Sequence, residues 1–357
     1  MSEENKPNND AVVNDVDQED GILYLGMDLG TSRTAVAASN GIRESVLTAV
    51  GYPKDVVSKK LFKGREALFG EEAIHNRTSL NFHQPLAEGV IIHNEVEIKA
   101  AQDIIRHAME MACSRKGDLI YAVIGAPAQA SLENKGLIID AVREVADSVI
   151  ICSEPFAVAY GLDRLNETLV IDIGGGTIDL CRMHGTMPDA DDQITLDEAG
   201  DHIDRTLSKL IKDAHPEAQF SIQMIKEVKD RFSTVEDSIE PIKVTLPVDG
   251  RPTEFDITKE MKEACLTIVP PIVGAINTLV ATFEPEFQAQ LCNNVLMGGG
   301  GSQIRGLDRA IERALDELGG GRVIKVEEPL YAGANGALKI AHDMPEEYWE
   351  HFRENSK

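Results

Sequence analysis

The chain has 357 residues, 43% of them hydrophobic and 27% charged, which is typical of a globular protein with room for two domains. Its formal charge of −25 opposes broad contact with a phosphate backbone or an anionic lipid surface, so nucleic acid is not an expected partner. The apolar runs are strand-sized, and no direct membrane insertion is expected.

The first half of the chain opens with an acidic stretch and then alternates between strand and helix patterns. Residues 1–20 carry seven acidic residues, one lysine and no aromatic residue, which predicts a disordered acidic tail. Residues 22–38 then predict two strands joined by the turn Asp28-Leu29-Gly30-Thr31-Ser32. After a segment with little periodicity, 53–95, the pattern predicts a helix over 96–114, a strand over 118–126, a helix over 128–145, a strand over 149–153 and a short helix over 155–163.

The second half repeats the opening pattern. Residues 168–181 again form strand, glycine turn and strand, with Asp172-Ile173-Gly174-Gly175-Gly176-Thr177 lying 144 positions after the first turn. This spacing indicates an internal duplication. Further on we predict helices over 201–235, a hairpin over 244–257, a long helix over 258–281 that Pro270-Pro271 should kink or split, a strand over 293–301, and helices over 304–318 and 333–341.

Three glycine-rich turns carry the chemistry. Glycine allows backbone N–H groups to approach an anion, and Thr and Ser add hydroxyl donors, so two facing turns would clamp a polyphosphate. A carboxylate beside a phosphate requires a cation, which predicts Mg²⁺ held largely through water by the two turn aspartates. The third turn has no acidic or basic residue and suits a nucleoside. The predicted binding residues are Gly30, Thr31 and Ser32; Gly174, Gly175 and Gly176; Gly298, Gly299, Gly300 and Gly301; and, for the metal, Asp28 and Asp172.

Other residue patterns argue against further metal sites. The five cysteines contain no CxxC pair, which fits reduced thiols in the cytoplasm, and the nine histidines never fall at zinc spacing. Cys152 and Cys181 lie within apolar segments, where we expect them to be buried.

The order of the three turns resembles that of the sugar kinase, Hsp70 and actin superfamily, over residues 22 to about 341. The resemblance implies an α/β actin-like ATPase fold, with two duplicated domains, each carrying a small subdomain, around a cleft for ATP or ADP and Mg²⁺. It also implies that IGAPAQAS and EPLYAGANGALKIA are the connecting helices at the hinge. The implied division is a domain over 21–160 with an insertion at about 51–95, a domain over 161–328 with a subdomain at about 201–257, and a helix within 329–357 that returns to the first domain before a short tail.

The resemblance also assigns roles to single residues. Glu154, in Ser153-Glu154-Pro155, matches the glutamate of bacterial actins that orients or activates the attacking water, and Asp172 and Thr177 join it as catalytic residues. The alternative role for the Glu154 carboxylate is to cap the N-terminus of the following helix, which favours negative charge. Lys229 resembles the lysine that lies along the adenosine in bacterial actins. The carboxylate expected one helical turn before it is replaced by Lys226, so the alternative is that Lys229 is a solvated helix residue without a role in binding.

Within the superfamily the chain is similar to the bacterial actins, and the stretches VGYPKDVVSKKL, SEPFAVAYGLDRL and GGGGSQIRGL resemble their magnetosome-associated branch. Similarity to that branch implies that the protein polymerises with itself into a cytoplasmic, cytoskeletal filament, and that ATP drives the turnover of this filament. It also implies contacts with magnetosome-associated adaptor proteins. A monomeric ATP-dependent enzyme, a chaperone-like ATPase, and an MreB-like or plasmid-segregating actin are the alternatives.

Overall fold

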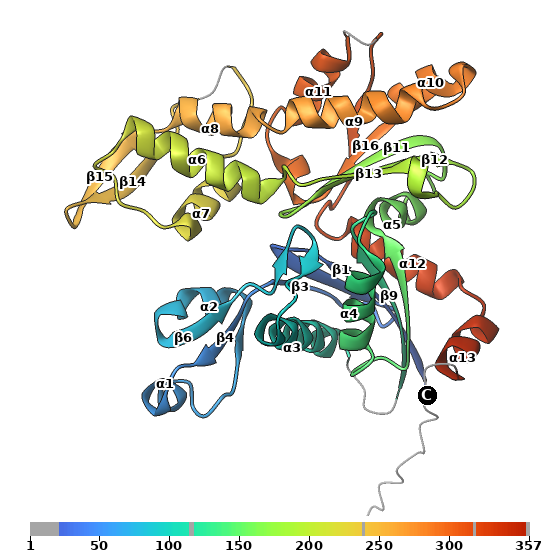
Figure 1. Ribbon diagram of the computed structural model, residues 1–357, viewed down its shortest axis with the longest axis horizontal. Coiled ribbons are helices and arrows are strands. Elements are labelled where there is room, and N and C mark those ends of the chain that lie inside the picture. The colour runs from blue at the N-terminus through green and yellow to red at the C-terminus, as the bar shows by residue number, and fades with distance from the viewer. Residues whose placement is uncertain (1–20, 114–117, 238–239, 317–318, 355–357) are drawn as a thin grey trace, which may run out of the picture.

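Two sheets with the same strand order form the framework of the protein (Figure 1). The computed structural model describes residues 21–113, 118–237, 240–316 and 319–354, so the predicted acidic tail lies outside the described residues. The first sheet has the order β10-β9-β1-β2-β3 and comprises Ile22–Leu29 (β1), Arg33–Ala38 (β2), Arg43–Leu47 (β3), Leu119–Ala126 (β9) and Ser148–Ser153 (β10). The second has the order β13-β12-β11-β16-β17 and comprises Asn166–Ile173 (β11), Ile178–His184 (β12), Gln193–Leu196 (β13), Val295–Gly298 (β16) and Val323–Lys325 (β17).

The pairing within the sheets confirms the internal duplication. In each sheet an antiparallel hairpin, β1–β2 or β11–β12, has its first strand paired in parallel with a later strand, β9 or β16. Asp28 and Asp172 occupy the same place, the last residue but one of β1 and of β11. We call the elements around the first sheet the first lobe and those around the second sheet the second lobe.

Each lobe carries a smaller structured part. In the first lobe, the segment without clear periodicity forms Val50–Pro53 (β4), Val56–Leu61 (α1), Leu68–Phe69 (β5), Gly70–His75 (α2), a 3₁₀ turn at Arg77–Ser79, Leu80–His83 (β6), Leu86–Ala87 (β7) and Val90–Ile91 (β8). In the second lobe, the predicted hairpin is confirmed as Lys243–Val248 (β14) and Arg251–Asp256 (β15). Its turn at Asp249-Gly250 has positive φ at both residues, as a tight hairpin requires.

The helices follow the apolar periodicity, with two corrections. The predicted helix over 128–145 is only Leu132–Val142 (α4), because the Ser131 side chain caps it by accepting from the backbone N–H of Asn134. The segment 201–235, predicted to be helical, forms two helices, Gly200–Ala214 (α6) and Ile222–Phe232 (α7), with a break that was not predicted. Pro216 explains the break, since a residue before proline avoids the helical conformation. The remaining helices are Glu95–Ala112 (α3), Glu154–Gly161 (α5), Pro285–Cys292 (α10), Leu307–Leu315 (α11), Ala332–Asp343 (α12) and Glu346–Glu354 (α13), with 3₁₀ turns at Ala190–Asp192 and Gly300–Gln303.

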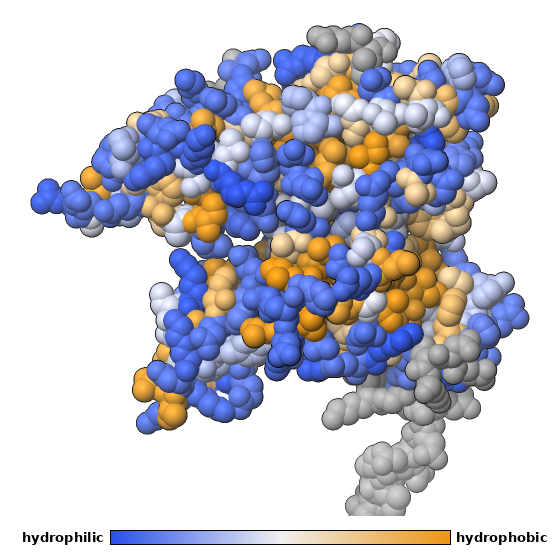
Figure 2. Space-filling view, viewed as in Figure 1, coloured by the Kyte–Doolittle hydropathy of each residue, from blue (hydrophilic) through white to orange (hydrophobic). Residues whose placement is uncertain are grey.

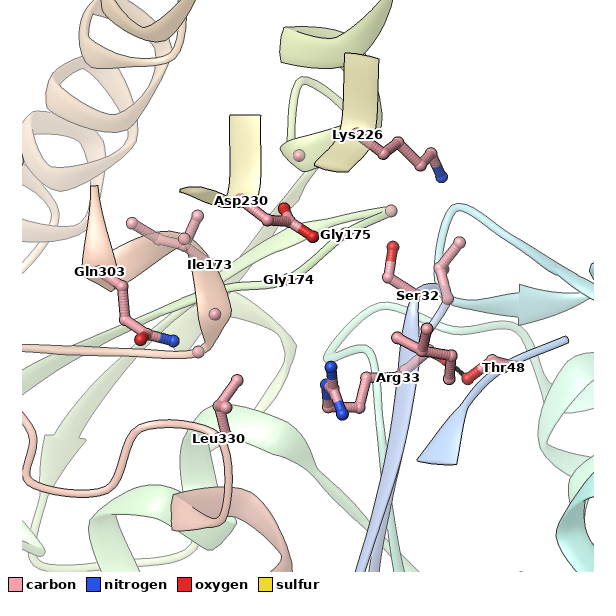
Figure 3. A pocket seen from close by; sticks show the side chains of 18 of the residues that line it. Ser32, Arg33, Thr48, Ile173, Gly174, Gly175, Lys226, Asp230, Gln303 and Leu330 are labelled. Carbon is pink, nitrogen blue, oxygen red and sulfur yellow. Dashed lines mark hydrogen bonds between the residues drawn. The ribbon is translucent and has the colours of Figure 1, made fainter. Parts of the chain in front are cut away.

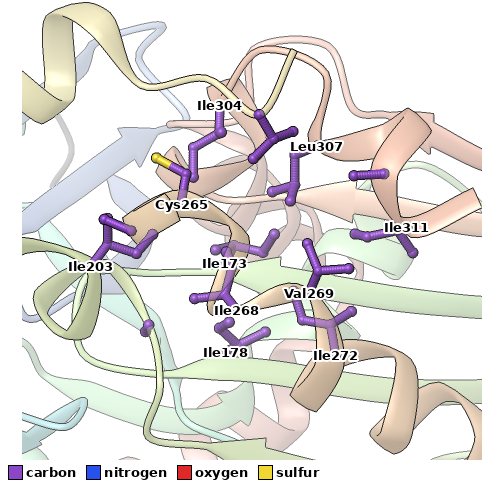
Figure 4. Packing of buried hydrophobic residues seen from close by; sticks show 14 of the residues in the cluster. Ile173, Ile178, Ile203, Cys265, Ile268, Val269, Ile272, Ile304, Leu307 and Ile311 are labelled. Carbon is purple, nitrogen blue, oxygen red and sulfur yellow. The ribbon is translucent and has the colours of Figure 1, made fainter. Parts of the chain in front are cut away.

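The predicted split of the long helix is confirmed. Thr258–Leu266 (α8) ends before Val269–Ala281 (α9), and the proline pair lies in the first turn of α9, where a missing N–H costs nothing. The 24-residue segment Thr258–Ala281 is long and apolar enough to cross a membrane by composition, which was not expected. Here the two helices bury one side in the core of the second lobe, where Ile268 and Ile272 pack against strand and helix residues (Figure 4).

Glycines set the crossing of α5 and α12, the two helices between the sheets. A Cβ on Gly336 would lie 1.8 Å from the carbonyl oxygen of Ala157, and a Cβ on Gly26 of β1 would lie 2.2 Å from the carbonyl oxygen of Ala334. The small residues of the last predicted helix therefore serve close packing. Helices α10 and α13 were not predicted. Trp349 anchors α13 by stacking on Tyr121 with ring centroids 5.1 Å apart.

We predict that Gly336→Ala lowers the thermal unfolding midpoint, because the added methyl group would overlap backbone at the α5–α12 crossing, which typically costs about 1–3 kcal/mol. Gly136→Ala in α4 is the matched control. A Cβ there meets nothing within 4 Å, and alanine should stabilise a helix by about 0.5–1 kcal/mol. Differential scanning fluorimetry of both variants checks this, and an unchanged midpoint for Gly336→Ala would contradict the packing described.

Candidate functional site

A cavity of about 430 Å³ lies between the two lobes, within the size range of small-molecule sites. Figure 3 shows side chains from both lobes around it, with Ser32 and Arg33 on one side and Lys226, Asp230 and Gln303 on others. Of the predicted site residues, the lining includes Asp28, Gly30, Thr31, Ser32, Glu154, Asp172, Gly174, Gly175, Gly176, Thr177, Lys229, Gly299, Gly300 and Gly301. Gly298 is not among them, since it lies within β16, paired with Asp172.

The two phosphate-type turns touch each other. A Cβ on Gly175 would lie 2.3 Å from Ser32 Oγ, and a Cβ on Gly176 would lie 2.3 Å from Thr31 Oγ1, so only glycine fits at either place. The tip of the β7–β8 hairpin joins them, because the Gly89 N–H donates to Thr31 Oγ1 over 2.9 Å. The two turns, which lie 144 positions apart in the sequence, therefore present backbone N–H groups and hydroxyls to one small volume, as expected for a polyphosphate clamp.

Buried carboxyl groups lie directly behind these turns. Burial, followed by the charge of Asp179, raises the pKa of Asp28 to about 6. Burial, followed by the charges of Asp28 and Asp179, raises the pKa of Asp172 well above its usual value. Packing holds both in place, since a Cβ on Gly333 would lie 2.7 Å from Asp28 Oδ2, and one on Gly299 would lie 2.2 Å from Asp172 Oδ1. Burial and the neighbouring acidic groups thus disfavour the charged form of both carboxyl groups unless a cation is near.

Glu154 is the first residue of α5 and is buried with its side chain toward the cavity, beside Gly125 of β9. Burial raises its pKa well above the usual value, and the charges of Asp28, Asp179 and Asp172 add to this. A carboxyl group at this place is surrounded by the same acidic groups that face the turns. Whether Glu154 acts on a water molecule at the end of a bound polyphosphate stays a prediction.

The donor chemistry fits Mg²⁺. The facing groups are carboxylate oxygens, the ligands that this ion prefers. Among the described residues, no cluster of three or more His, Cys, Asp or Glu side chains is arranged to hold a metal ion directly. An ion at Asp28 and Asp172 would therefore take its other ligands from water and phosphate, which is how Mg²⁺ usually binds.

Lys229 lines the cavity and is held in an ion pair. Its Nζ lies 2.9 Å from Asp204 Oδ1 and donates to the Gly200 carbonyl oxygen over 3.2 Å. The two side chains are 14% and 1% exposed, so the alternative of a solvated lysine is wrong. Lys226 pairs instead with Asp201 over 2.8 Å. Whether Lys229 also contacts a nucleoside stays a prediction.

Sequence reasoning missed several lining or supporting groups. Asp179 lies in β12 opposite Asp172, and its Oδ1 accepts from the Ala128 N–H over 2.8 Å and from Thr195 Oγ1 over 2.6 Å. An aspartate inside the apolar strand IDLC is itself a signal, because a buried carboxyl needs partners. Residues 124–131, which resemble a connecting helix, are instead the end of β9 and a non-helical loop that leads to α4 within the first lobe. This loop reaches the second lobe through the hydrogen bond from the Ala128 N–H to Asp179.

The cysteines play no visible part in the cavity. Cys181 is buried as expected, whereas Cys152 keeps part of its surface exposed to solvent. Burial raises the pKa of Cys152 to about 12, so its thiol stays protonated at neutral pH.

Comparison with known proteins supports the resemblance found in the sequence. A family model described as MreB/Mbl protein matches residues 23–348. The actin-like protein MamK of Paramagnetospirillum magneticum is 40% identical over 328 residues, covering 92% of this chain and 94% of MamK. A solved MamK double helical filament superposes with a TM-score of 0.88 at 40% identity, covering 91% of this chain and all of the MamK chain. A non-polymerising MamK mutant bound to AMPPNP superposes at 0.69 with 39% identity and the same coverage. The predicted actin-like fold and the similarity to magnetosome-associated actins are confirmed.

We predict that Lys229→Met destabilises the protein by about 3 kcal/mol, because it leaves Asp204 buried without its partner. Lys226→Met is the matched control, since its pair with Asp201 is more exposed and should contribute about 1 kcal/mol or less. Adding Asp204→Asn to Lys229→Met should recover part of the loss. Urea denaturation of the four proteins checks this, and equal midpoints for the two lysine variants would show that the Lys229 pair is not special.

Proposed function

Because the chain belongs to the MreB/Mbl protein family, we propose that it is an actin-like ATPase that binds Mg-ATP in the cavity, assembles into filaments with ATP bound, and hydrolyses the nucleotide afterwards. The single observation that supports this most strongly is the contact of Ser32 with Gly175, which places two equivalent glycine turns around one site. The MamK filament and the AMPPNP-bound MamK mutant are relatives in which assembly and nucleotide binding are seen.

The residues of this chain divide the work of binding and hydrolysis. Backbone N–H groups and hydroxyls of both turns bind the phosphates, and the turns' mutual contact excludes bulk water. Asp28 and Asp172 would hold Mg²⁺ through its water shell, and the bound ion neutralises charge that develops on the phosphates. Thr177 closes the second turn on the side of Gly89, where it can position the terminal phosphate.

Glu154 acts on the attacking water. Its carboxyl group faces the cavity behind the turns and accepts a proton from the water or holds it in line with the terminal phosphate. The nucleoside would lie toward Gly299, Gly300 and Gly301, with Lys229 and Asp230 at its side. This arrangement leaves phosphate binding and water activation to separate groups.

The cellular role that we propose follows the similarity to MamK. The filament is cytoplasmic and cytoskeletal, and it organises magnetosomes in chains through adaptor proteins. A monomeric ATP-dependent enzyme remains the competing function, because the same cavity would serve it. Assembly therefore distinguishes the two functions.

We predict that the purified protein sediments at high speed with Mg-ATP, and releases phosphate, but stays in the supernatant without nucleotide. The same protein with ATP and excess EDTA is the control for the metal. Negative-stain electron microscopy of the pellet should show filaments. A protein that binds and hydrolyses Mg-ATP while remaining monomeric at all concentrations would favour the competing function.

We predict that Glu154→Ala binds Mg-ATP and polymerises like the parent but releases phosphate about 10²–10⁴-fold more slowly, because only the water loses its partner. Its filaments should disassemble slowly. Phosphate release and light scattering on one sample measure both steps. Hydrolysis at the parent rate would mean that Glu154 is only a helix cap, and loss of ATP binding would mean that its role is structural.

A further inference from the structure

Arg33 is a cation in the wall of the cavity to which the proposed mechanism gives no role. It is the first residue of β2, directly after the first turn, and its side chain lines the cavity. In Figure 3 the guanidinium points away from β2 into the space between the lobes. Figure 2 shows that the surfaces of the two lobes stay apart below α7, so a ligand can reach this space from solvent.

The charge of Arg33 lacks a carboxylate partner. Arg33 is half-buried, and among the residues that the structure describes no Asp or Glu side chain forms an ion pair with it. The two lysines of the same lining are paired, Lys226 with Asp201 and Lys229 with Asp204. A cation that is partly removed from water without an opposite charge loses hydration, and a bound anion would compensate for that loss.

Hydrogen bonds hold Arg33 in place at its backbone and at its side chain. The Gly30 N–H donates to the Arg33 carbonyl oxygen over 3.2 Å, which closes the first turn. Arg33 Nη1 donates to Ser45 Oγ of β3 over 3.2 Å. Because a guanidinium has five N–H donors, this contact sets its direction and leaves other donors for a ligand. The Arg33 side chain is therefore positioned before a ligand binds.

The position of Arg33 is between the two ends of the cavity. On one side is the first turn, which binds phosphate in the function that we propose. On the other side, Ser45 Oγ lies 3.5 Å from the Tyr331 hydroxyl. The preceding residue, Leu330, lies beside the third turn, since a Cβ on Gly300 would be 3.6 Å from Leu330 Cδ2. Because the third turn is the place proposed for the nucleoside, Arg33 faces the middle of a bound nucleotide, where the first phosphate joins the nucleoside.

We propose that Arg33 binds this first phosphate, the α-phosphate, as a specificity-determining contact that rests on the proposed ATPase function. A guanidinium can present two parallel N–H groups to two phosphate oxygens, so it recognises a phosphate by geometry as well as by charge. The α-phosphate is common to ATP, ADP and AMP, and it is not transferred in hydrolysis. A contact of equal strength in the ground state and the transition state tightens binding without changing the rate of the chemical step.

Arg33→Met tests the contact, because methionine keeps an unbranched side chain but has neither the charge nor the N–H donors. The dissociation constants for AMP and ADP, measured by isothermal titration calorimetry, should rise about 10–100-fold, while the constant for adenosine keeps its parent value. Arg33→Lys should restore part of the affinity, since lysine keeps the charge but loses the paired donors. Unchanged AMP and ADP affinity in Arg33→Met would overturn the proposal, and so would an equal loss for adenosine.

The kinetics of ATP hydrolysis distinguish the α-phosphate from the outer phosphates. In Arg33→Met the KM for Mg-ATP should rise by about the same factor as the ADP dissociation constant, with kcat at the parent value. A lower kcat together with unchanged AMP affinity would place Arg33 on a terminal phosphate, and the proposal would then be wrong.

Arg231→Met is the matched control for loss of charge. Arg231 also lines the cavity, but it is exposed, and its guanidinium lies 5.0 Å from the centroid of the Phe232 ring. The affinities of this variant should stay close to the parent values. An equal loss of affinity in Arg231→Met would mean that the overall charge of the cavity attracts the nucleotide, which would overturn the proposed contact. If the parent protein binds neither ADP nor ATP, the proposed ATPase function itself fails.

Discussion

The contact between Thr31-Ser32 and Gly175-Gly176 is the constraint on which the other features depend. Side chains at either glycine would overlap the first turn, so the two turns can approach only because a Cβ is missing. That approach places Asp28 and Asp172 behind one small volume, where burial, followed by the charge of Asp179 at Asp28 and by the charges of Asp28 and Asp179 at Asp172, raises the pKa of both. In the function that we propose, a polyphosphate and a cation bound together would balance the backbone N–H groups and the carboxyl groups of this site.

The approach of the turns is set by elements that lie outside the cavity. The α5–α12 crossing at Gly336 fixes how the second sheet sits relative to β1, and the residues around Ala128 join the lobes by donating to Asp179. Asp179 is therefore positioned by one lobe and bonded by the other. A relative rotation of the lobes would change the contact between the turns, which gives a physical route from nucleotide binding to the shape of the whole subunit.

Much of the site was predictable from the sequence because its signals are local. Asp28 with Gly30 and Asp172 with Gly174 each lie in a short strand-turn-strand pattern, and the repetition of the pattern predicted the duplicated fold. The partners of Lys229 and Asp179 were not predictable, because Asp204 and Ala128 come from distant elements with no shared periodicity. Trp349 was missed for the same reason, since its stacking on Tyr121 depends on how α13 folds back on the sheet. The break at Pro216 was missed although its signal is local.

The central claim is that both glycine turns bind one nucleotide together with one metal ion. A structure of the protein with Mg-AMPPNP tests it most directly. We expect the phosphates between Thr31-Ser32 and Gly174–Gly176, with the metal ion on the side of Asp28 and Asp172 and a water molecule near Glu154. Nucleotide bound to one turn only, or a metal ion remote from both aspartates, would contradict the account.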